Sequence, residues 1–228
     1  MDLNKDLDQA SAAYRAKRDE LLAAEIALKD QRERVAELRR ALPPGPIVET
    51  DYVFKEGPRD LADGDPAKIV EVRLSELFQP GQPSLIVDHM MFDPAHDNAC
   101  PMCALWADGY DGIARHVADR AAFVVVAKAP IAKLRAWGDA RGWRNLRLLS
   151  AYENSFNQDF LVEQQAAQLP AVSVFTKAED GTIRHHYTSQ ASLTFTHHRG
   201  IDLMNPVWHL FDLLPEGRGD WFPKHDYG

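Results

Sequence analysis

The segment Ala99-Cys100-Pro101-Met102-Cys103 holds both cysteines of this 228-residue chain, two residues apart and with a proline after the first. An apolar run from Ser84 to Phe92 precedes it and has the character of a buried strand. The segment that follows, Ala104 to Arg120, is expected to form a helix. A pair of thiols placed between a strand and a helix is the arrangement that thiol–disulfide chemistry needs.

The order of the residues predicts different roles for the two thiols. A thiolate attacks a disulfide, whereas a thiol hardly does, and the pKa of a free cysteine lies near ~8.5. The N–H groups and the partial positive charge at a helix N-terminus lower such a pKa. Pro101 suits the first helical turn, where a missing N–H costs nothing. We therefore expect Cys100 to attack and Cys103, about one turn deeper, to resolve the mixed disulfide.

Other interpretations of the C-x-x-C sequence remain open. The thiols could be buried and inert, or form half of a zinc site completed by His89, His96 or His116, since there is no second C-x-x-C. Peroxiredoxins resemble the expected fold but carry Pro-x-x-x-Thr-x-x-Cys, and here Asp93 and Asp97 occupy the Pro and Thr positions. Dithiol exchange is the favoured hypothesis. The alternatives are a peroxidase and a non-enzymatic interaction module whose thiols are incidental or bind zinc.

The overall composition narrows the class of partner. The chain has 34 acidic and 26 basic residues and a net charge of −8, which argues against nucleic acid or an anionic membrane as main partner. No segment approaches the ~20 apolar residues of a membrane span. Residues 1–6 lack the apolar core of a signal peptide, so a cytoplasmic location is predicted. The expected substrate is a protein or small-molecule disulfide, and we predict no cofactor and no metal.

Residues 2–42 are predicted to form one long helix, because they contain no Gly or Pro and are rich in helix-forming residues. The sequence Pro-Pro-Gly-Pro at 43–46 ends it. At ~1.5 Å per residue the helix would span roughly 60 Å, so it must wrap its own domain, break, or pair with a second copy in a homodimer. We expect a helical extension at 1–46 and an α/β domain at 47–228. The apolar residues of the helix recur mostly at steps of three, four or seven: Leu3, Leu7, Ala10, Tyr14, Leu21, Leu28, Val35, Leu38 and Leu42.

The rest of the chain alternates between strands and helices, as is typical of an α/β domain. The continuous apolar run at 123–127 has the composition of a parallel strand that is covered on both faces. Gly109 and Gly112 weaken the helix after the dithiol and allow a kink or a break there. Strands are expected at 52–54, 68–74, 84–92, 123–127, 146–149, 170–175 and 182–188, and helices at 104–120, 130–142 and 206–214.

Motifs spread over nearly the whole chain resemble those of the bacterial DUF899 family. The resemblance implies a thioredoxin-like three-layer α/β/α sandwich, here with a long N-terminal helix and a C-terminal extension. It also implies a dithiol–disulfide oxidoreductase without an established substrate. The chain departs from the family at Ala127 and Lys128, where Ser and Arg are usual, and at Ala171, where Gly is usual. The motifs are Arg39-Arg40-Ala41-Leu42-Pro43, Asp51-Tyr52-Val53-Phe54, Leu85-Ile86-Val87, His89-Met90-Met91-Phe92, Cys100-Pro101-Met102-Cys103, Ala107-Asp108, Val126-Ala127-Lys128-Ala129-Pro130, Gly142-Trp143, Phe156-Asn157-Gln158-Asp159-Phe160, Ser173-Val174-Phe175, Arg199-Gly200-Ile201-Asp202 and Pro215-Glu216-Gly217-Arg218-Gly219.

Three further residues are candidates for the site. Pro170 directly precedes a strand, at the position where thioredoxin-like folds place a cis-proline facing the dithiol. Because cis bonds are a minority of X–Pro bonds, its isomer stays open. Asp88 and His89 lie in an otherwise apolar strand that leads to the dithiol, and either could take a proton from Cys103. The alternative for them is a strand-end aspartate and a satisfied core histidine.

Two histidine pairs, His185-His186 and His197-His198, could suggest a metal site. The first pair is expected on a hairpin strand, where neighbouring side chains point to opposite faces and one ion could not easily use both. We interpret both pairs as structural or surface residues.

Overall fold

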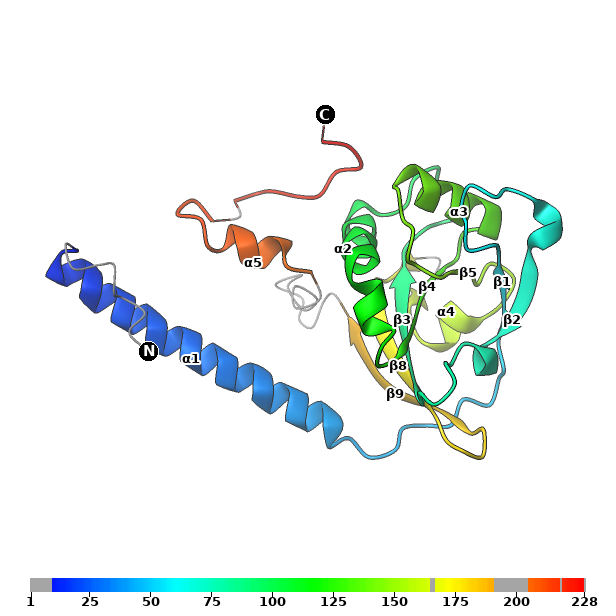
Figure 1. The fold of residues 1–228 in the computed structure, drawn as a ribbon, viewed down its shortest axis with the longest axis horizontal. Helices are drawn as coiled ribbons and strands as arrows, with labels where there is room; N and C mark the ends of the chain where they lie inside the picture. The colour runs from blue at the N-terminus through cyan, green and yellow to red at the C-terminus, as the bar shows by residue number, and fades with distance from the viewer. Residues whose placement is uncertain (1–9, 165–166, 191–204, 218, 228) are drawn as a thin grey trace. The chain divides into compact units, whose positions relative to one another are not determined.

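The structure of the chain, a computed structural model, describes residues 10–164, 167–190, 205–217 and 219–227. It separates into two compact units, residues 1–43 and residues 44–228. The described part of the first unit contains one long helix, and the second contains a sheet with helices (Figure 1).

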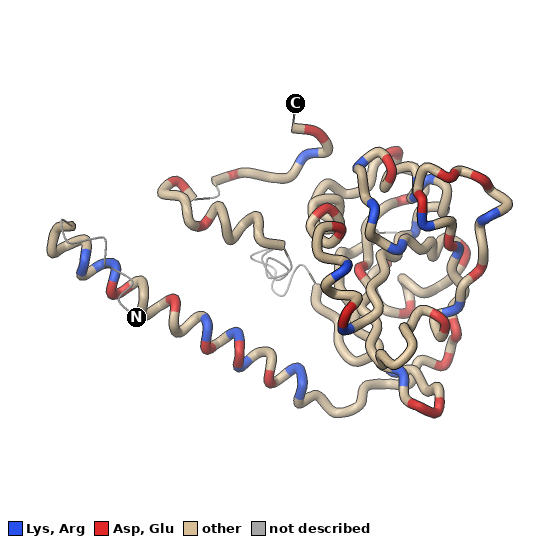
Figure 2. The backbone as a smooth tube through the Cα atoms, viewed as in Figure 1, with Lys and Arg blue, Asp and Glu red and all other residues tan. Residues whose placement is uncertain are grey.

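Helix α1 (Ala12–Arg40) has 29 residues. The hydroxyl of Ser11 accepts the N–H of Tyr14 at 3.1 Å and caps its start. Arg39 and Arg40 in the last turn suit the partial negative charge at the helix end. Basic and acidic residues follow one another along its length (Figure 2), and none of its residues is buried. The long predicted helix is therefore present, but it begins at Ala12, after the cap Ser11, and ends at Arg40, so among the described residues it is shorter than the predicted range 2–42. Residues 2–9 of that range lie outside the described residues.

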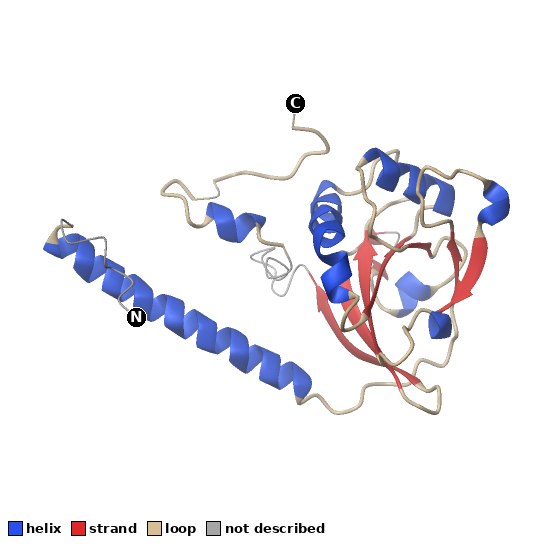
Figure 3. Ribbon diagram, viewed as in Figure 1, coloured by secondary structure: helices blue, strands red, loops and turns tan. Residues whose placement is uncertain are grey.

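Within the described residues, the second unit is built on a seven-stranded sheet in the order β2-β1-β5-β4-β3-β8-β9 (Figures 1 and 3). Neighbours β3 and β4, and β4 and β5, run parallel, while the pairs β1–β2, β1–β5, β3–β8 and β8–β9 are antiparallel. A separate ribbon pairs β6 with β7. The strands are β1 (Val53–Glu56), β2 (Val70–Arg73), β3 (Ser84–Met90), β4 (Ala122–Ala127), β5 (Leu148–Ser150), β6 (Glu163–Gln164), β7 (Ala167–Gln168), β8 (Ala171–Lys177) and β9 (Ile183–Gln190).

The helix after the dithiol begins three residues before the expected range 104–120, at the proline that was expected in its first turn, and it is unbroken. Helix α2 starts at Pro101, which takes the first helical position, and continues through Gly109 and Gly112. Gly109 allows a close approach instead of a kink: a Cβ there would lie 3.0 Å from the side-chain nitrogen of Asn205. The helices of this unit are α2 (Pro101–Val117), α3 (Ile131–Ala140), α4 (Phe156–Asp159) and α5 (Val207–Phe211), with short turns η1 (Pro66–Lys68) and η2 (Leu74–Glu76).

Successive side chains of β4 enter two different cores, because strand side chains alternate between the faces of a sheet. Val125 belongs to a core with Trp106 of α2 and Leu134 of α3. Val124 belongs to a second core that contains Phe156 of α4. A parallel β3-α2-β4 unit beside the antiparallel β8–β9 hairpin is the thioredoxin-like arrangement. The predicted α/β fold is confirmed, although among the described residues the helical layer on the second face consists of the four-residue helix α4.

The predicted C-terminal extension packs against the helical face of the sheet. The side chain of Asn205 donates to the carbonyl of Leu105 in α2 at 3.1 Å. Trp208 is 4% exposed and lies in the core that contains Trp106. These contacts fix the described part of the extension to α2.

Candidate functional site

The dithiol lies where β3 passes into α2. Cys100 is the N-cap residue of α2, with an extended backbone, and Pro101 is the first helical residue. The N–H of Cys100 donates to the carbonyl of Met91 at 3.0 Å, and its carbonyl accepts the first helical hydrogen bond, from Ala104 at 2.9 Å. The hydrogen bond to Met91 holds the helix start against the end of the strand. The chain geometry predicted from the C-x-x-C segment is therefore present.

The two thiols differ in exposure and in acidity. Cys100 is partly exposed, and its pKa is lowered to about 6, chiefly because the Cys103 thiol donates a hydrogen bond to it, helped by the backbone N–H groups of Cys103 and Met102 and opposed by burial. Cys103 is 1% exposed. Its pKa is raised well above the usual value, because it gives that hydrogen bond and is buried, although the N–H of Met91 lies 3.5 Å from its sulfur. One thiol is thus acidic and accessible, and the other is a buried proton donor.

Asp88 lies in β3 on the face that α2 covers. It is 1% exposed, and neither carboxyl oxygen has a hydrogen-bond partner among the described residues. Burial without a partner raises its pKa to about 8. Its charge also raises the pKa of Cys103 and that of Tyr110, a residue of α2. Asp88 is therefore electrostatically linked to the buried thiol.

His89, the next residue, points to the opposite face of the sheet. Its ring stacks on Phe156 with centroids 5.5 Å apart, and its Nε2 lies 2.8 Å from the hydroxyl of Ser173. Burial, with a smaller contribution from His185, lowers its pKa to about 3, so its ring is neutral near neutral pH. The structure therefore separates the two residues that the sequence could not distinguish: Asp88 shares a face with Cys103, and His89 does not.

Pro170 lies alongside the end of β3. The following residue, Ala171, pairs with His89, and the side chain of Gln168 accepts the N–H of Phe92 at 3.0 Å. No cis peptide bond occurs among the described residues, so the bond that precedes Pro170 is trans. Of the two isomers that the sequence left open, this is the commoner one.

Tyr110 and Trp106 are members of this region that sequence reasoning did not single out. Both are buried on α2, and both carry a side-chain polar atom without a hydrogen-bond partner among the described residues. The sequence does contain a signal for them, because Trp106, Ala107, Tyr110 and Ala114 follow Cys103 by three, four, seven and eleven residues. That spacing places them on one helix face.

Of the histidines considered as metal ligands, some are exposed at the surface and others make contacts within the protein. His96 and His116 are exposed, and His185 lies within 2.7 Å of the hydroxyl of Thr188. Among the described residues, no group of three or more His, Cys, Asp or Glu side chains is placed to hold a metal ion. The pair His197-His198 lies outside the described residues.

These features define the class of protein: a thioredoxin-like α/β domain with a dithiol at the start of the helix that joins two central parallel strands. The chain belongs to the family described as bacterial protein of unknown function (DUF899), whose model matches residues 6–227. No curated protein matches the sequence.

Solved structures with a similar arrangement include peroxiredoxins and a thioredoxin. Reduced Prx3 from Vibrio vulnificus in complex with H2O2 is 13% identical, with a TM-score of 0.44, and covers 68% of this chain and 88% of its own. The pneumococcal exposed lipoprotein thioredoxin Etrx1 from Streptococcus pneumoniae is 14% identical, with a TM-score of 0.41 and coverages of 67% and 96%. Mycobacterium bovis AhpC is 13% identical, with a TM-score of 0.48 and coverages of 79% and 98%.

Within the part of the chain that the structure describes, no helix is both long enough and apolar enough to span a bilayer.

We predict that Asp88→Asn makes the protein more stable, and increasingly so as the pH rises. Between the usual aspartate pKa of ~3.9 and the folded-state value of about 8, the folded protein keeps a proton that the unfolded chain releases. Wild-type stability therefore falls with pH across this window, and Asn removes that fall. The difference in unfolding free energy should grow by about 1.4 kcal/mol per pH unit between about pH 5 and about pH 7.

Urea denaturation at several pH values measures this difference, and the titration of Cys100 cancels because both proteins contain it. Asp97→Asn, at an exposed position of the loop before the dithiol, is the control for the loss of one carboxyl group. Parallel stability profiles for wild type and Asp88→Asn would show that Asp88 is ionised in the folded protein.

Proposed function

We propose that this protein is a thiol–disulfide oxidoreductase in which Cys100 attacks and Cys103 resolves. The observation that carries the proposal is the asymmetry of the two thiols. Cys100 is partly exposed with a pKa lowered to about 6, so it is mainly a thiolate at neutral pH. Cys103 is buried and keeps its proton, which it shares with the neighbouring thiolate.

The reaction proceeds in two exchanges. The Cys100 thiolate attacks one sulfur of a substrate disulfide, which forms a mixed disulfide and releases the other sulfur as a thiolate. The Cys103 thiol then loses its proton, and its thiolate attacks the sulfur of Cys100. The second substrate sulfur leaves as a thiolate. The substrate gains two electrons, and the protein is left with a Cys100–Cys103 disulfide.

Asp88 is the residue that we propose as acceptor of the Cys103 proton. It lies on the same face of the sheet and acts on the pKa of Cys103. Because its own pKa is raised to about 8, it accepts the Cys103 proton in its ionised form, and the share of that form grows as the pH rises toward this value. Once the mixed disulfide forms, Cys100 no longer carries a charge, so the hydrogen bond that held the Cys103 proton is lost. His89 has no such part in the proposal, because it packs on the other face.

The two prolines have supporting parts in the proposal. Pro101 starts α2 without an N–H, and the N–H groups of Met102 and Cys103 remain free to donate to the Cys100 thiolate. Pro170, beside the end of β3, would border the surface on which a substrate disulfide approaches Cys100. The substrate is a protein or small-molecule disulfide.

A peroxidase is the alternative from the same fold. In the loop before the dithiol, Asp93 accepts the N–H of Ala95 at 2.7 Å and closes a turn. Asp97 is exposed. These are the positions at which peroxiredoxins carry Pro and Thr, so dithiol exchange is the function that the loop supports better.

We expect Cys100 of the reduced protein to react with iodoacetamide with an apparent pKa of about 6. The rate of modification, followed by mass spectrometry of the Cys100 peptide from about pH 4 to about pH 9, should reach half of its plateau at that pH, whereas free glutathione reaches half only near ~8.5–9. A Cys100 profile that follows glutathione would contradict the proposed attacking thiol.

Serine substitutions should separate the two thiols by stoichiometry. With an excess of Ellman's reagent, the reduced wild-type protein should rapidly release two equivalents of the coloured thiol, one per exchange step. Cys103→Ser should release one equivalent and retain a mixed disulfide at Cys100, visible as added mass. Cys100→Ser should react at least about 100-fold more slowly, because Cys103 is buried and protonated. Equal rates for the two variants would place the chemistry elsewhere.

We also propose that α1 pairs with α1 of a second copy. Tyr14, Leu21 and Leu28 are about half exposed and recur every seven residues, the spacing of a coiled-coil seam. Leu21→Lys combined with Leu28→Lys should convert a dimer into a monomer in light scattering, because the lysines would place like charges in the seam. The matched control, Ala16→Lys with Ala23→Lys, lies outside the seam and should leave the mass unchanged. A wild-type monomer would contradict the proposal.

A further inference from the structure

A cavity lies near the starts of the parallel strands, at the opposite end of the sheet from the dithiol. It has a volume of about 510 Å³, within the range of small-molecule sites. Phe123 and Leu148, near the starts of the parallel strands β4 and β5, line it, together with Ala114 and Ala118 at the far end of α2. Cys103 and Ala114 are eleven residues apart on that helix, or roughly 16 Å. The cavity is therefore a separate site from the dithiol.

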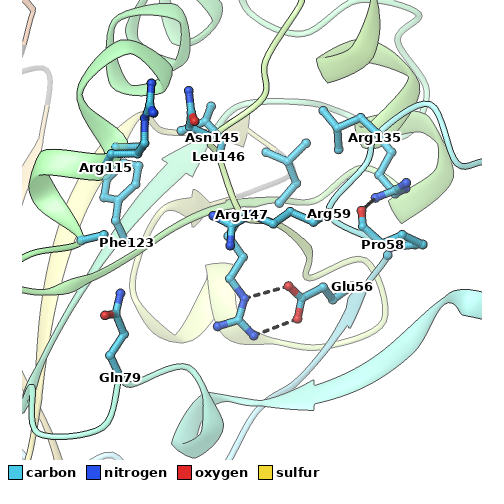
Figure 4. A pocket seen from close by; sticks show the side chains of 15 residues that line it. Glu56, Pro58, Arg59, Gln79, Arg115, Phe123, Arg135, Asn145, Leu146 and Arg147 are labelled. Carbon is cyan, nitrogen blue, oxygen red and sulfur yellow. Dashed lines mark hydrogen bonds and ion pairs between the residues drawn. The ribbon is translucent and has the colours of Figure 1, made fainter.

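The cavity is strongly cationic although the chain as a whole has a net charge of −8. Four arginines and one glutamate line it: Arg59, Arg115, Arg135, Arg147 and Glu56. Figure 4 shows them reaching the space from separate elements, Arg115 from α2, Arg135 from α3 and Arg147 from the segment before β5. A local positive field in an acidic protein indicates a negatively charged ligand.

Arg147 and Glu56 neutralise each other. Two hydrogen bonds join the guanidinium to the carboxylate at 2.7 and 2.8 Å, drawn as dashed lines in Figure 4. This pair forms one wall of the cavity. Arg59 and Arg115 form no ion pair within the described residues, so their charges are left for a ligand. Arg135 adds a positive charge that the nearby Asp63 carboxylate, itself paired with Lys68, partly offsets.

Arg135 supplies a buried positive charge. It is 5% exposed, and its guanidinium donates to the carbonyls of Pro58, Asp60 and Asp63, the last two at 2.8 Å. These acceptors are neutral, so the hydrogen bonds satisfy the donors without cancelling the charge. Gly57 makes room for this arrangement, because a Cβ there would lie 2.7 Å from the Arg135 side chain. The guanidinium is thus held rigidly beside the cavity.

Arg59 and Arg115 are the donors that a ligand can reach. Both are exposed, and within the described residues neither forms an ion pair or a side-chain hydrogen bond. A guanidinium presents its N–H groups as a planar fork, which suits two oxygens of a phosphate or carboxylate. Beside them, Leu61, Phe123 and Leu146 give the cavity an apolar wall.

The geometry points to a binding site for a small organic phosphate, with the phosphate on Arg59 and Arg115 and an apolar group against Phe123 and Leu146, in a cavity to whose positive field Arg135 contributes. A dianion matches two free guanidinium groups, and the apolar wall has a use only if the ligand carries an organic part. This site is independent of the proposed dithiol chemistry.

Titration calorimetry of the full-length reduced protein with phenyl phosphate at low salt tests the site. Saturable binding at one site is expected. Arg59→Gln and Arg115→Gln should each weaken it by about ten-fold or more, since each removes a charge-assisted hydrogen-bonding group. Arg120→Gln, at an exposed position outside the cavity, should change it by less than about two-fold. Arg115→Lys should retain part of the affinity, which confirms that charge at an intact site is being measured.

Two other ligands show which parts of phenyl phosphate the cavity recognises. Inorganic phosphate should bind more weakly than phenyl phosphate, because it lacks the apolar part, and phenol should not bind measurably, because it lacks the charge. Cys100→Ser should bind phenyl phosphate as the wild type does, which separates this site from the dithiol. The proposal is overturned if phenyl phosphate shows no saturable binding, if phenol binds as tightly, or if Arg120→Gln weakens binding as much as the cavity variants.

Discussion

Parallel strands cannot be joined by a tight turn, and this constraint positions the dithiol. Strands β3 and β4 run parallel from Leu85 opposite Ala122 to Met90 opposite Ala127, so the chain must cross the sheet between them. Helix α2 is that crossing, and its first turn has to stand at the end of β3. The backbone of Met91 makes the junction specific, because its carbonyl accepts from Cys100 and its N–H points to the sulfur of Cys103. The parallel pairing of β3 and β4 therefore determines where α2 begins and where the two thiols lie.

The same strand carries a residue that packing does not explain. Asp88 stands where an aliphatic side chain would suit the core, and its carboxyl group has no hydrogen-bond partner among the described residues. A buried carboxyl group without a partner lowers the stability of the folded protein. The proposed exchange reaction gives a reason for that cost, since a proton acceptor beside a buried thiol must itself be buried. His89, in contrast, is explained by its contacts with Ser173 and Phe156.

Local patterns predicted much of this architecture because they report local constraints. The long helix α1, the apolar strands and the helix start at Pro101 all follow from propensity and spacing, and the family membership followed from motifs along the chain. The face on which Asp88 lies could not be predicted in this way. Alternation along the strand shows that Asp88 and His89 point to opposite faces of the sheet, but it does not show which face α2 covers. The cavity lined by arginines could not be predicted from the sequence either, because its residues come from segments far apart in the chain. The close approach of Asn205 to Gly109 was equally out of reach, because the two residues are almost a hundred positions apart.

The deep position of Cys103 has a consequence for oxidative damage. An exposed, acidic cysteine is the kind of residue that peroxides convert to a sulfenic acid, and further oxidation to the sulfinic state is irreversible in most proteins. A sulfenic acid on Cys100 would lie within hydrogen-bonding distance of a second thiol that solvent oxidants do not reach. Condensation of the two would release water and leave a disulfide, which cellular thiols can reduce. In the chemistry that we propose, the buried cysteine would therefore protect the partly exposed one from irreversible oxidation.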